Sequence, residues 1–323
     1  MRKVYMNGEF VDEKEAKLSI YDSALMFGDM VFEMTRSFNK KQFKLKEHLE
    51  RLYMGLRILQ VPLKMTIDEM EQACYKTIEE NEPFFDEHDE HRLLIEVSRG
   101  PLGIYSPVFD GETGPNVIIA DFPLKWTVAS MAPLFDHGIN LVITSQRAIP
   151  GYLLDPKIKN RSRLFYQMAN IEVSNVQGEN NWALLLDPDG FITEGTGNNF
   201  FMVRNGEILT PEGRNILRGI SRNYIFEVAD QLGIPCKECN LEPYDLYEAD
   251  ESFITATPFC LLPCTSINGA TIGKGQMGEI TSALLKQWSA NVEVDIEAQI
   301  KEFNKEIIHI NKDAPTPYKF NKS

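Results

Sequence analysis

The spacing of apolar positions changes several times along the chain, and each change predicts a different element. In the segment KEHLERLYMGLRIL, four leucines recur three or four residues apart, which predicts an amphipathic helix with one buried face: Leu49, Leu52, Leu56 and Leu59. The runs RLLIEVS (92–98) and NVIIADF (116–122) are short and rich in β-branched residues, which predicts two strands. Helices and strands are therefore mixed along the first part of the chain.

The second part of the chain repeats this mixture. The apolar run INLVITS (139–145) predicts a strand, and RLFYQMANIEVSNVQ (163–177) predicts a helix. The DPDG at 187–190 separates two apolar runs, which predicts a β-hairpin. A stripe at helical spacing predicts a helix that opens after a glycine, and it consists of Ile220, Tyr224, Val228 and Leu232. With the strand expected in SFITATP (252–258), the fold class predicted for the whole chain is α/β (α+β).

Two mixed stretches joined by an irregular one indicate two domains, for which 323 residues are enough. The segment FPLKWTVASMAPLFDHG contains two prolines and has no clean period, so we expect it to connect them. We expect a smaller N-terminal domain at 1–122, a connection at 123–138 and a larger C-terminal domain at 139–290. Residues 291–323 should form a charged C-terminal tail, helical at first in EAQIKEFNKEI and irregular afterwards.

Composition and charge limit the partners that this chain can have. The chain is 43% hydrophobic and 25% charged, which is ordinary globular composition. The formal net charge of −14 argues against nucleic acid or an anionic membrane as a partner, because those partners need clustered Lys and Arg. No apolar run approaches the ~20 residues that cross a bilayer, and the first residues lack a signal-peptide pattern. We therefore expect a cytoplasmic protein.

The cysteines and histidines do not form a recognisable redox or metal motif. Five cysteines are an odd number, and the C-x-x-C at 236–239 neither opens a helix nor has a second such motif to pair with. We expect this C-x-x-C to lie on an edge strand. The H-x-x-H of His88 and His91 lies in the acidic run FFDEHDEHR, which predicts a solvated turn rather than a metal site. No metal is expected.

Several charged or polar residues remain candidates for chemistry. Lys157 and Lys159 stand two positions apart in LLDPKIKNRSRLF, although lysines usually only wet a surface. The run LRGISR opens a helix with free N–H groups that suit an anion, and the alternative is an ordinary start capped by Ser221. Arg51 and Arg36 could supply charges for a phosphate and a carboxylate, or could simply be solvated. The run EGTGNN lacks the third glycine of a dinucleotide-binding loop, so we set that function aside.

A set of motifs in sequence order resembles the class IV aminotransferases. These are the fold type IV enzymes that use pyridoxal 5′-phosphate, and they include branched-chain and D-amino-acid aminotransferases and aminodeoxychorismate lyase. The resemblance covers roughly residues 3–288, and a combination of motifs is far more specific than any one of them. It is carried by YDSALMFGDMVFEMTRSFNKKQFKLKEHLERL (21–52), PKIKN (156–160), DGFITEGTGNNFF (189–201), LTPEGRNILRGISR (209–222) and FITATPFCLLP (253–263).

The resemblance implies which residues hold the cofactor. In the family, the lysine that forms the Schiff base precedes the glutamate of the "EG" motif by a little over thirty residues, and Lys159 precedes Glu194 by 35. Lys159 is therefore the lysine expected to bind pyridoxal phosphate covalently, with Lys157 as the alternative. Glu194 corresponds to the carboxylate that faces the pyridine nitrogen of the cofactor. The residues expected at the cofactor phosphate are Arg51, Gly219, Ile220, Ser221 and Thr257.

The resemblance also implies where the substrate binds and where this chain departs from the family. Phe32 and Arg36 align with substrate-binding residues of branched-chain enzymes, with Arg36 near the substrate carboxylate. Branched-chain enzymes have a tyrosine five residues after the lysine, and this chain has Leu164 there. We expect Arg163 or Tyr166 to take the place of that tyrosine. The loop after SRG lacks the arginine and histidine of the D-amino-acid type.

The resemblance implies a two-domain fold type IV aminotransferase architecture and a homodimer, with the active site between the domains and near the subunit interface. The expected reaction moves an amino group from an amino acid to a 2-oxo acid, as branched-chain aminotransferases do. The alternatives are an aminodeoxychorismate-lyase-type enzyme, an (R)-amine or D-amino-acid transaminase, and a cofactor-binding protein without turnover. We expect no nucleic acid or membrane partner.

Overall fold

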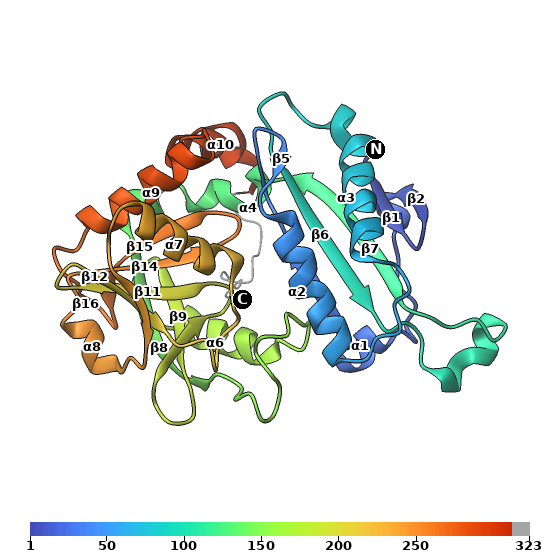
Figure 1. Ribbon diagram of the computed structural model, residues 1–323, viewed down its shortest axis with the longest axis horizontal. Helices are drawn as coiled ribbons and strands as arrows, with labels where there is room; N and C mark the ends of the chain where they lie inside the picture. The colour runs from blue at the N-terminus through green and yellow to red at the C-terminus, as the bar shows by residue number, and fades with distance from the viewer. Residues whose placement is uncertain (312–323) are drawn as a thin grey trace. The chain divides into compact units, whose positions relative to one another are not determined.

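The computed structural model describes residues 1–311, and the chain divides into two compact units (Figure 1). The first unit contains residues 1–124 and 158–163, and the second contains residues 125–157 and the chain from 164 onward. The first boundary falls next to the expected connection, whereas the return of residues 158–163 to the first unit is not visible in the sequence. It arises because this segment hydrogen-bonds along the edge strand β3 (Met30–Met34): Phe32 N–H donates to Lys159 O at 2.9 Å, and Arg161 N–H donates to Met30 O at 3.0 Å.

The first unit is a five-stranded antiparallel sheet in the order β2-β1-β7-β6-β3. Both predicted strands are confirmed, and they pair with each other along their whole length. In Figure 1, α2 and α3 lie side by side over this sheet. The elements are β1 (Lys3–Met6), β2 (Glu9–Asp12), η1 (Glu13–Glu15), α1 (Ser23–Phe27), β3, β4 (Ser37–Phe38), β5 (Lys41–Gln42), α2 (Leu45–Ile58), α3 (Ile67–Asn81), η2 (Glu82–Phe84), β6 (His91–Ser98), η3 (Gly103–Phe109) and β7 (Asn116–Pro123).

The leucine stripe of α2 makes the core of the first unit. Leu49, Leu52 and Leu56 are buried and pack with Ile95 and Ile119 of the sheet, while Leu59 is partly buried against the same core. Full burial of a leucine side chain contributes roughly 1.5–3 kcal/mol, so this face fixes the helix on the sheet. The helix therefore sets the position of the polar residues between its leucines, including Arg51.

The described part of the second unit contains nine strands, and six of them form a closed ring. Each of β10, β9, β8, β15, β14 and β11 pairs with the next, and β10 also pairs with β11, so no edge is left in this ring. The elements are α4 (Lys125–Val128), η4 (Ala129–Met131), α5 (Leu134–His137), β8 (Ile139–Arg147), α6 (Leu164–Ser174), β9 (Asn181–Leu186), β10 (Ile192–Gly195), β11 (Asn199–Arg204), β12 (Glu207–Pro211), α7 (Ile220–Gln231), β13 (Cys236–Cys239), α8 (Pro243–Tyr247), β14 (Glu251–Ala256), β15 (Cys260–Ile267), β16 (Ala270–Thr271), α9 (Glu279–Asn291) and α10 (Ile296–Asn311).

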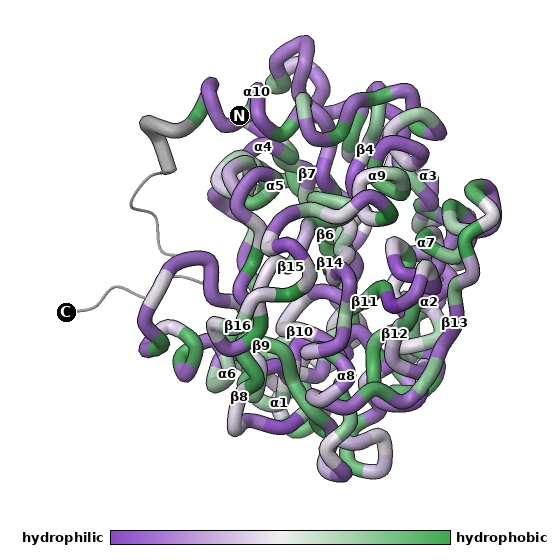
Figure 2. The backbone as a smooth tube through the Cα atoms, turned by 90° about the vertical axis from the view of Figure 1, so that its left-hand side faces the viewer, coloured by the Kyte–Doolittle hydropathy of each residue, from purple (hydrophilic) through white to green (hydrophobic). Residues whose placement is uncertain are grey.

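The predicted elements of the second unit are present. The DPDG turn joins β9 and β10 as an antiparallel hairpin, and Figure 2 shows mainly hydrophobic positions along β9. The C-x-x-C lies on β13, which ends the sheet as the predicted edge strand. The helix α7 begins directly after Gly219. Within the described residues, no helix is long and apolar enough to cross a membrane.

One expectation about an irregular segment is wrong. Residues 125–137 form three short helical turns rather than an irregular connection, because Pro123 and Pro133 interrupt a stretch that is otherwise apolar enough to be buried. The helix predicted at the start of the charged tail is present as α10, which packs on α4 and η4 through buried residues: Ile296, Ile300, Phe303 and Ile307. The irregular end expected after this helix lies outside the described residues.

Candidate functional site

Glu194 is fixed by three hydrogen bonds within the second unit. Its side chain is only 5% exposed. The Tyr166 hydroxyl donates to Oε1 at 2.8 Å, while Asn199 Nδ2 and the Leu217 N–H donate to Oε2 at 2.9 Å and 3.0 Å. Glu194 and Asn199 are also direct partners between β10 and β11. A buried carboxylate with this many donors is held in a single orientation.

The start of α7 lies beside this carboxylate. Asn199 Nδ2 also donates to the Leu217 carbonyl at 2.9 Å, which ties the loop before the helix to the glutamate. A Cβ at Gly219 would lie 2.1 Å from Asn199 Oδ1, so only glycine fits the N-cap position. The helix start has no side-chain cap, so the alternative of a start capped by Ser221 is wrong. The backbone N–H groups of Ile220 and Ser221 are therefore suited to an anion.

Thr257 lies in the turn between β14 and β15. Three residues, 257–259, connect Ala256 to Cys260, and these two residues pair across the hairpin. Cys260 has a φ of 64°, a left-handed conformation that non-glycine residues seldom adopt. Such a residue after a turn is typical of a three-residue hairpin loop, so the backbone at Thr257 is closely defined. The Thr257 side chain is half-buried.

In the first unit, Lys159 lies next to Phe32. Its Nζ is 4.9 Å from the centroid of the Phe32 ring, and the guanidinium carbons of Arg161 and Arg163 are 3.7 Å and 4.9 Å from the same centroid. Phe32 itself is buried. Lys157 has a different environment in the second unit, where its Nζ is 2.8 Å from Asp155 Oδ1. That pairing is an ordinary one for a lysine near the surface.

Arg51 has a partner, Glu33, that the sequence analysis missed. The carboxylate of Glu33 accepts hydrogen bonds from Arg51 Nε and Nη2, each at 2.7 Å, and from His48 Nδ1 at 2.7 Å. Burial raises the pKa of Glu33, but the charge of Arg51 and the hydrogen bonds from His48 and Arg51 outweigh burial and hold this pKa well below its usual range. The signal for this partner in the sequence is Glu33 itself, the single charged residue within the apolar run MVFEM.

Arg36 and the residues proposed for the missing tyrosine have distinct surroundings. Arg36 is fully buried, with its guanidinium carbon 3.8 Å from the centroid of the Phe38 ring and its Nε donating to the Ser37 carbonyl at 3.2 Å. Leu164 is 74% exposed at the start of α6. Arg163 Nε donates to the Asn160 carbonyl at 2.8 Å, while Tyr166 donates to Glu194.

The expectation of a solvated turn at His88 and His91 is wrong for the second histidine. His91 opens β6 and is completely buried, because its ring nitrogens contact Asp121 Oδ2 at 2.8 Å and a carboxylate oxygen of Glu82. The acidic run therefore leads into a core strand. Residues 1–311 contain no group of three or more His, Cys, Asp or Glu arranged to hold a metal ion.

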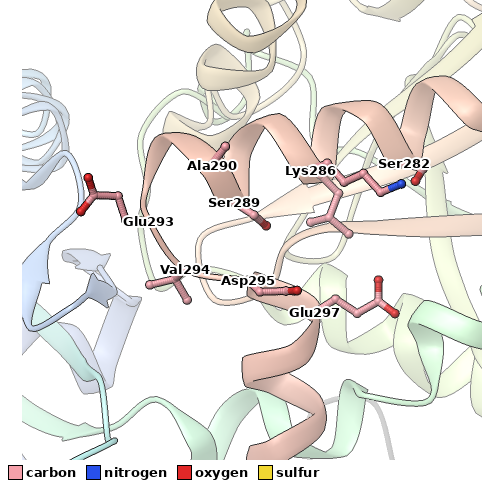
Figure 3. Close-up of a pocket in the computed structure, with 9 residues that line it drawn as sticks. Ser282, Lys286, Ser289, Ala290, Glu293, Val294, Asp295 and Glu297 are labelled. Atoms are coloured by element: carbon pink, nitrogen blue, oxygen red, sulfur yellow. The ribbon is translucent and has the colours of Figure 1, made fainter.

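A pocket of about 440 Å³ in the second unit contains none of the predicted site residues. It lies between the end of α9 and the start of α10, as Figure 3 shows. Its charged lining consists of Lys286 and three carboxylates, those of Glu293, Asp295 and Glu297. An excess of negative charge disfavours a phosphate, so this pocket does not suit the expected cofactor.

The predicted site residues that the structure describes do fit pyridoxal phosphate. The uncapped start of α7, where Gly219 leaves room that a Cβ would fill, suits the phosphate. Glu194 offers a fixed carboxylate for a protonated ring nitrogen. Within the first unit, Lys159 and Arg51 supply an amine and a guanidinium, the two basic groups that the cofactor requires.

Comparisons with known proteins agree with this chemistry. The family model for amino-transferase class IV matches residues 30–267. A provisionally named branched-chain-amino-acid aminotransferase of Methanocaldococcus jannaschii is 37% identical over 289 residues, which cover 88% of this chain and 95% of that protein.

Solved structures of branched-chain aminotransferases share the fold. The Escherichia coli enzyme superposes with a TM-score of 0.79 at 27% identity, covering 90% of this chain and 94% of that one. The Thermoproteus uzoniensis enzyme with norvaline superposes with a TM-score of 0.77 at 27% identity, covering 94% and 97%. The chain therefore belongs to the amino-transferase class IV family, as a pyridoxal phosphate-dependent transaminase that resembles the branched-chain-amino-acid aminotransferases.

Proposed function

We propose that this protein transfers the amino group of a branched-chain L-amino acid to a 2-oxo acid, with pyridoxal 5′-phosphate bound covalently to Lys159. The names of its relatives support the substrate class. The choice of Lys159 is supported by its place beside Phe32, while the amine of Lys157 pairs with Asp155. A homodimer in the cytoplasm remains part of this proposal.

The arrangement around Glu194 is the single observation that carries the proposal. The bound cofactor supplies an electron sink, which works best when its ring nitrogen is protonated. Glu194 is proposed to face that nitrogen and to stabilise its proton. The three donors on this carboxylate, from Tyr166, Asn199 and Leu217, hold it in place without neutralising its charge.

The remaining site residues are proposed to bind and orient. The N–H groups at the start of α7, with Gly219, Ile220 and Ser221, bind the phosphate, together with Thr257 and Arg51. A helix start and an arginine suit the same anion for different reasons, the first through backbone N–H groups and the second through a fork of donors. Lys159 then acts as the base that moves the proton at the reacting carbon of the substrate.

Phe32 and Arg36 are proposed to bind the substrate. Phe32 lies within 5 Å of the Lys159 amine, so an apolar side chain can pack near the reacting group. Arg36 is proposed for the substrate carboxylate, and its complete burial over Phe38 also suits a purely structural role. The two roles give different kinetics.

The test is a comparison of amino donors with the purified, cofactor-loaded protein. L-leucine, L-isoleucine and L-valine should convert a 2-oxo acid to its amino acid with kcat/KM values at least ~10²-fold above those of D-alanine and (R)-1-phenylethylamine, the size of discrimination that binding pockets reach. Preference for either of the latter two, or turnover of aminodeoxychorismate without a 2-oxo acid, would contradict the proposal.

A further inference from the structure

The arginine proposed for the cofactor phosphate belongs to a largely buried cluster of charged and polar residues. It consists of Glu33 on β3 and of His48 and Arg51, which lie three residues apart on α2 and so face the same side of this helix. Glu33 is fully buried and His48 is 1% exposed. Both histidine and arginine donate to the one carboxylate, at 2.7 Å in each bond. We call these three residues the β3–α2 cluster.

The cluster has no net charge when His48 is neutral, because the carboxylate of Glu33 balances the guanidinium of Arg51. Burial lowers the pKa of His48, Glu33 opposes this effect, and the positive charges of Arg51 and Lys159 lower the pKa further. These three are the charged groups that act on His48, and they come from β3, α2 and the segment 158–163. A neutral His48 donates its Nδ1–H to Glu33.

The other ring nitrogen of His48 has an unusual environment. His48 Nε2 is buried, and it has no hydrogen-bond partner in the part of the chain that the structure describes. A buried polar atom without a partner costs about 1–3 kcal/mol, so such atoms are rare and often have a functional reason. In a neutral His48 this nitrogen is a bare acceptor, and it is the position that a second proton would occupy.

An anion bound at Arg51 makes the charge around His48 Nε2 more negative. A phosphate dianion offsets the positive charge of Arg51, which is one of the charges that disfavour protonation of His48, and leaves the cluster with a net negative charge. We propose that His48 is a phosphate-responsive residue of the cofactor site, which takes up a proton from solvent at Nε2 when a dianion binds at Arg51, while Glu33 holds both side chains in place. This inference rests on the proposed role of Arg51.

The test uses sulfate, which is a dianion throughout the neutral range and cannot react with Lys159. Apoprotein is titrated with sulfate by calorimetry in buffers of different ionisation enthalpy, which gives the number of protons taken up. The wild-type protein should take up close to one proton, and its sulfate affinity should fall as pH rises. No uptake would overturn the proposal.

Two variants separate His48 from the other histidines. His48→Asn keeps a donor for Glu33 but has no second nitrogen to protonate, so the proton uptake should vanish and sulfate affinity at pH 6 should fall about tenfold, the equivalent of one pKa unit. His88→Asn changes an exposed histidine of the same unit and should behave as the wild type. Equal uptake in His48→Asn and the wild type would overturn the proposal.

A second readout needs no variant. Nitrogen-15 chemical shifts of the wild-type histidine rings should show one ring passing from the neutral to the doubly protonated pattern as sulfate is added, and no such change would overturn the proposal. Failure here is distinct from failure of the proposed function. If Lys159 and Glu194 are needed for transamination but His48 takes up no proton, the enzyme assignment stands and only the proton link is lost.

Discussion

The two units hold their proposed phosphate-binding groups in different ways. In the second unit the groups are backbone N–H donors at the start of α7, and Asn199 connects them to Glu194. In the first unit the group is the side chain of Arg51, whose charge is already balanced by a fully buried glutamate. Backbone donors need no counterion, whereas a largely buried guanidinium does. Phosphate binding at Arg51 should therefore depend on pH and on changes of charge more than phosphate binding at the start of α7.

The largest expected effect comes from the lysine itself. Lys159→Ala should lower turnover by at least about 10³-fold, because we propose that this amine both forms the covalent link to the cofactor and moves the proton. Lys157→Ala, which removes the pair with Asp155 and a hydrogen bond to the Arg214 carbonyl, should keep both turnover and the yellow colour of the bound cofactor. Steady-state kinetics and visible absorption measure this, and the reverse outcome would assign the cofactor to Lys157.

Glu194→Gln tests the fixed carboxylate of the second unit. The exchange keeps the shape and removes the charge, so cofactor should still bind while kcat falls about 10²-fold, as expected when a preorganised charge is lost. The matched control is Glu172→Gln in the same unit, where a carboxylate accepts from Ser145 N–H at 2.7 Å in a structural role. An unchanged kcat in Glu194→Gln would remove the role at the pyridine nitrogen.

Arg36→Met tests whether the first unit binds the substrate carboxylate. A charge-assisted hydrogen bond is worth roughly 1.5–3 kcal/mol, so kcat/KM for an amino acid should fall by one to two decades. The loss should be small for an amine that has no carboxylate. Equal losses for both donors would show that Arg36 is structural, as its burial against Phe38 allows.

Tyr166→Phe removes one of the three donors from Glu194. The other two remain, so kcat should fall only about tenfold, near the lower limit for a hydrogen bond to a charged group. Cofactor affinity should stay the same, since the protein groups proposed to bind the cofactor phosphate are unchanged. Tyr152→Phe, at an exposed tyrosine of the same unit, is the control. If kcat for Tyr166→Phe matched this control, Tyr166 would have no role in holding Glu194.

The smallest effect concerns the stability of the first unit. Burial raises the pKa of Asp121 to about 6, and hydrogen bonds to Asp121 and Glu82 raise the pKa of His91 despite the opposing effect of burial. Both groups therefore bind protons more tightly in the folded state, so their stabilisation is lost as pH rises, from about 4 to 6 for Asp121 and above the usual pKa of histidine for His91. Above the usual pKa of histidine, the free energy of unfolding should fall less steeply with pH in Glu82→Gln than in the wild type, because the exchange removes a charge that raises the pKa values of both His91 and Asp121. Denaturant unfolding at several pH values checks this, and parallel curves would contradict it.

The sequence predicted elements better than it predicted partners. The leucine stripe of α2, the hairpin at DPDG and the helix after Gly219 depend on local spacing and turn chemistry, which are visible in one segment. The link from Glu33 to Arg51 joins a strand to a helix, so no local pattern contains it. Tertiary contacts of this kind are the part that sequence reasoning could not supply.

His91 and the segment 158–163 show the same limit. An acidic stretch normally predicts solvent exposure, but the ring of His91 is buried because Asp121, thirty residues later, provides its partner. Likewise, Lys159 was predicted from its spacing to Glu194, whereas its neighbour Phe32 and its place along β3 emerge only from the fold. Family motifs identified candidate residues, and the structure supplied the groups around them.

The proposed enzyme can be tested by locating the cofactor on the chain. Borohydride reduction of the cofactor-loaded protein fixes the cofactor to its lysine, and digestion followed by mass spectrometry identifies the modified peptide. We predict one phosphopyridoxyl group per chain, on Lys159, with none after prior incubation with L-leucine, because the amino group has then been transferred to the cofactor. A label on Lys157 or any other lysine, or a label on Lys159 that L-leucine does not remove, would contradict it.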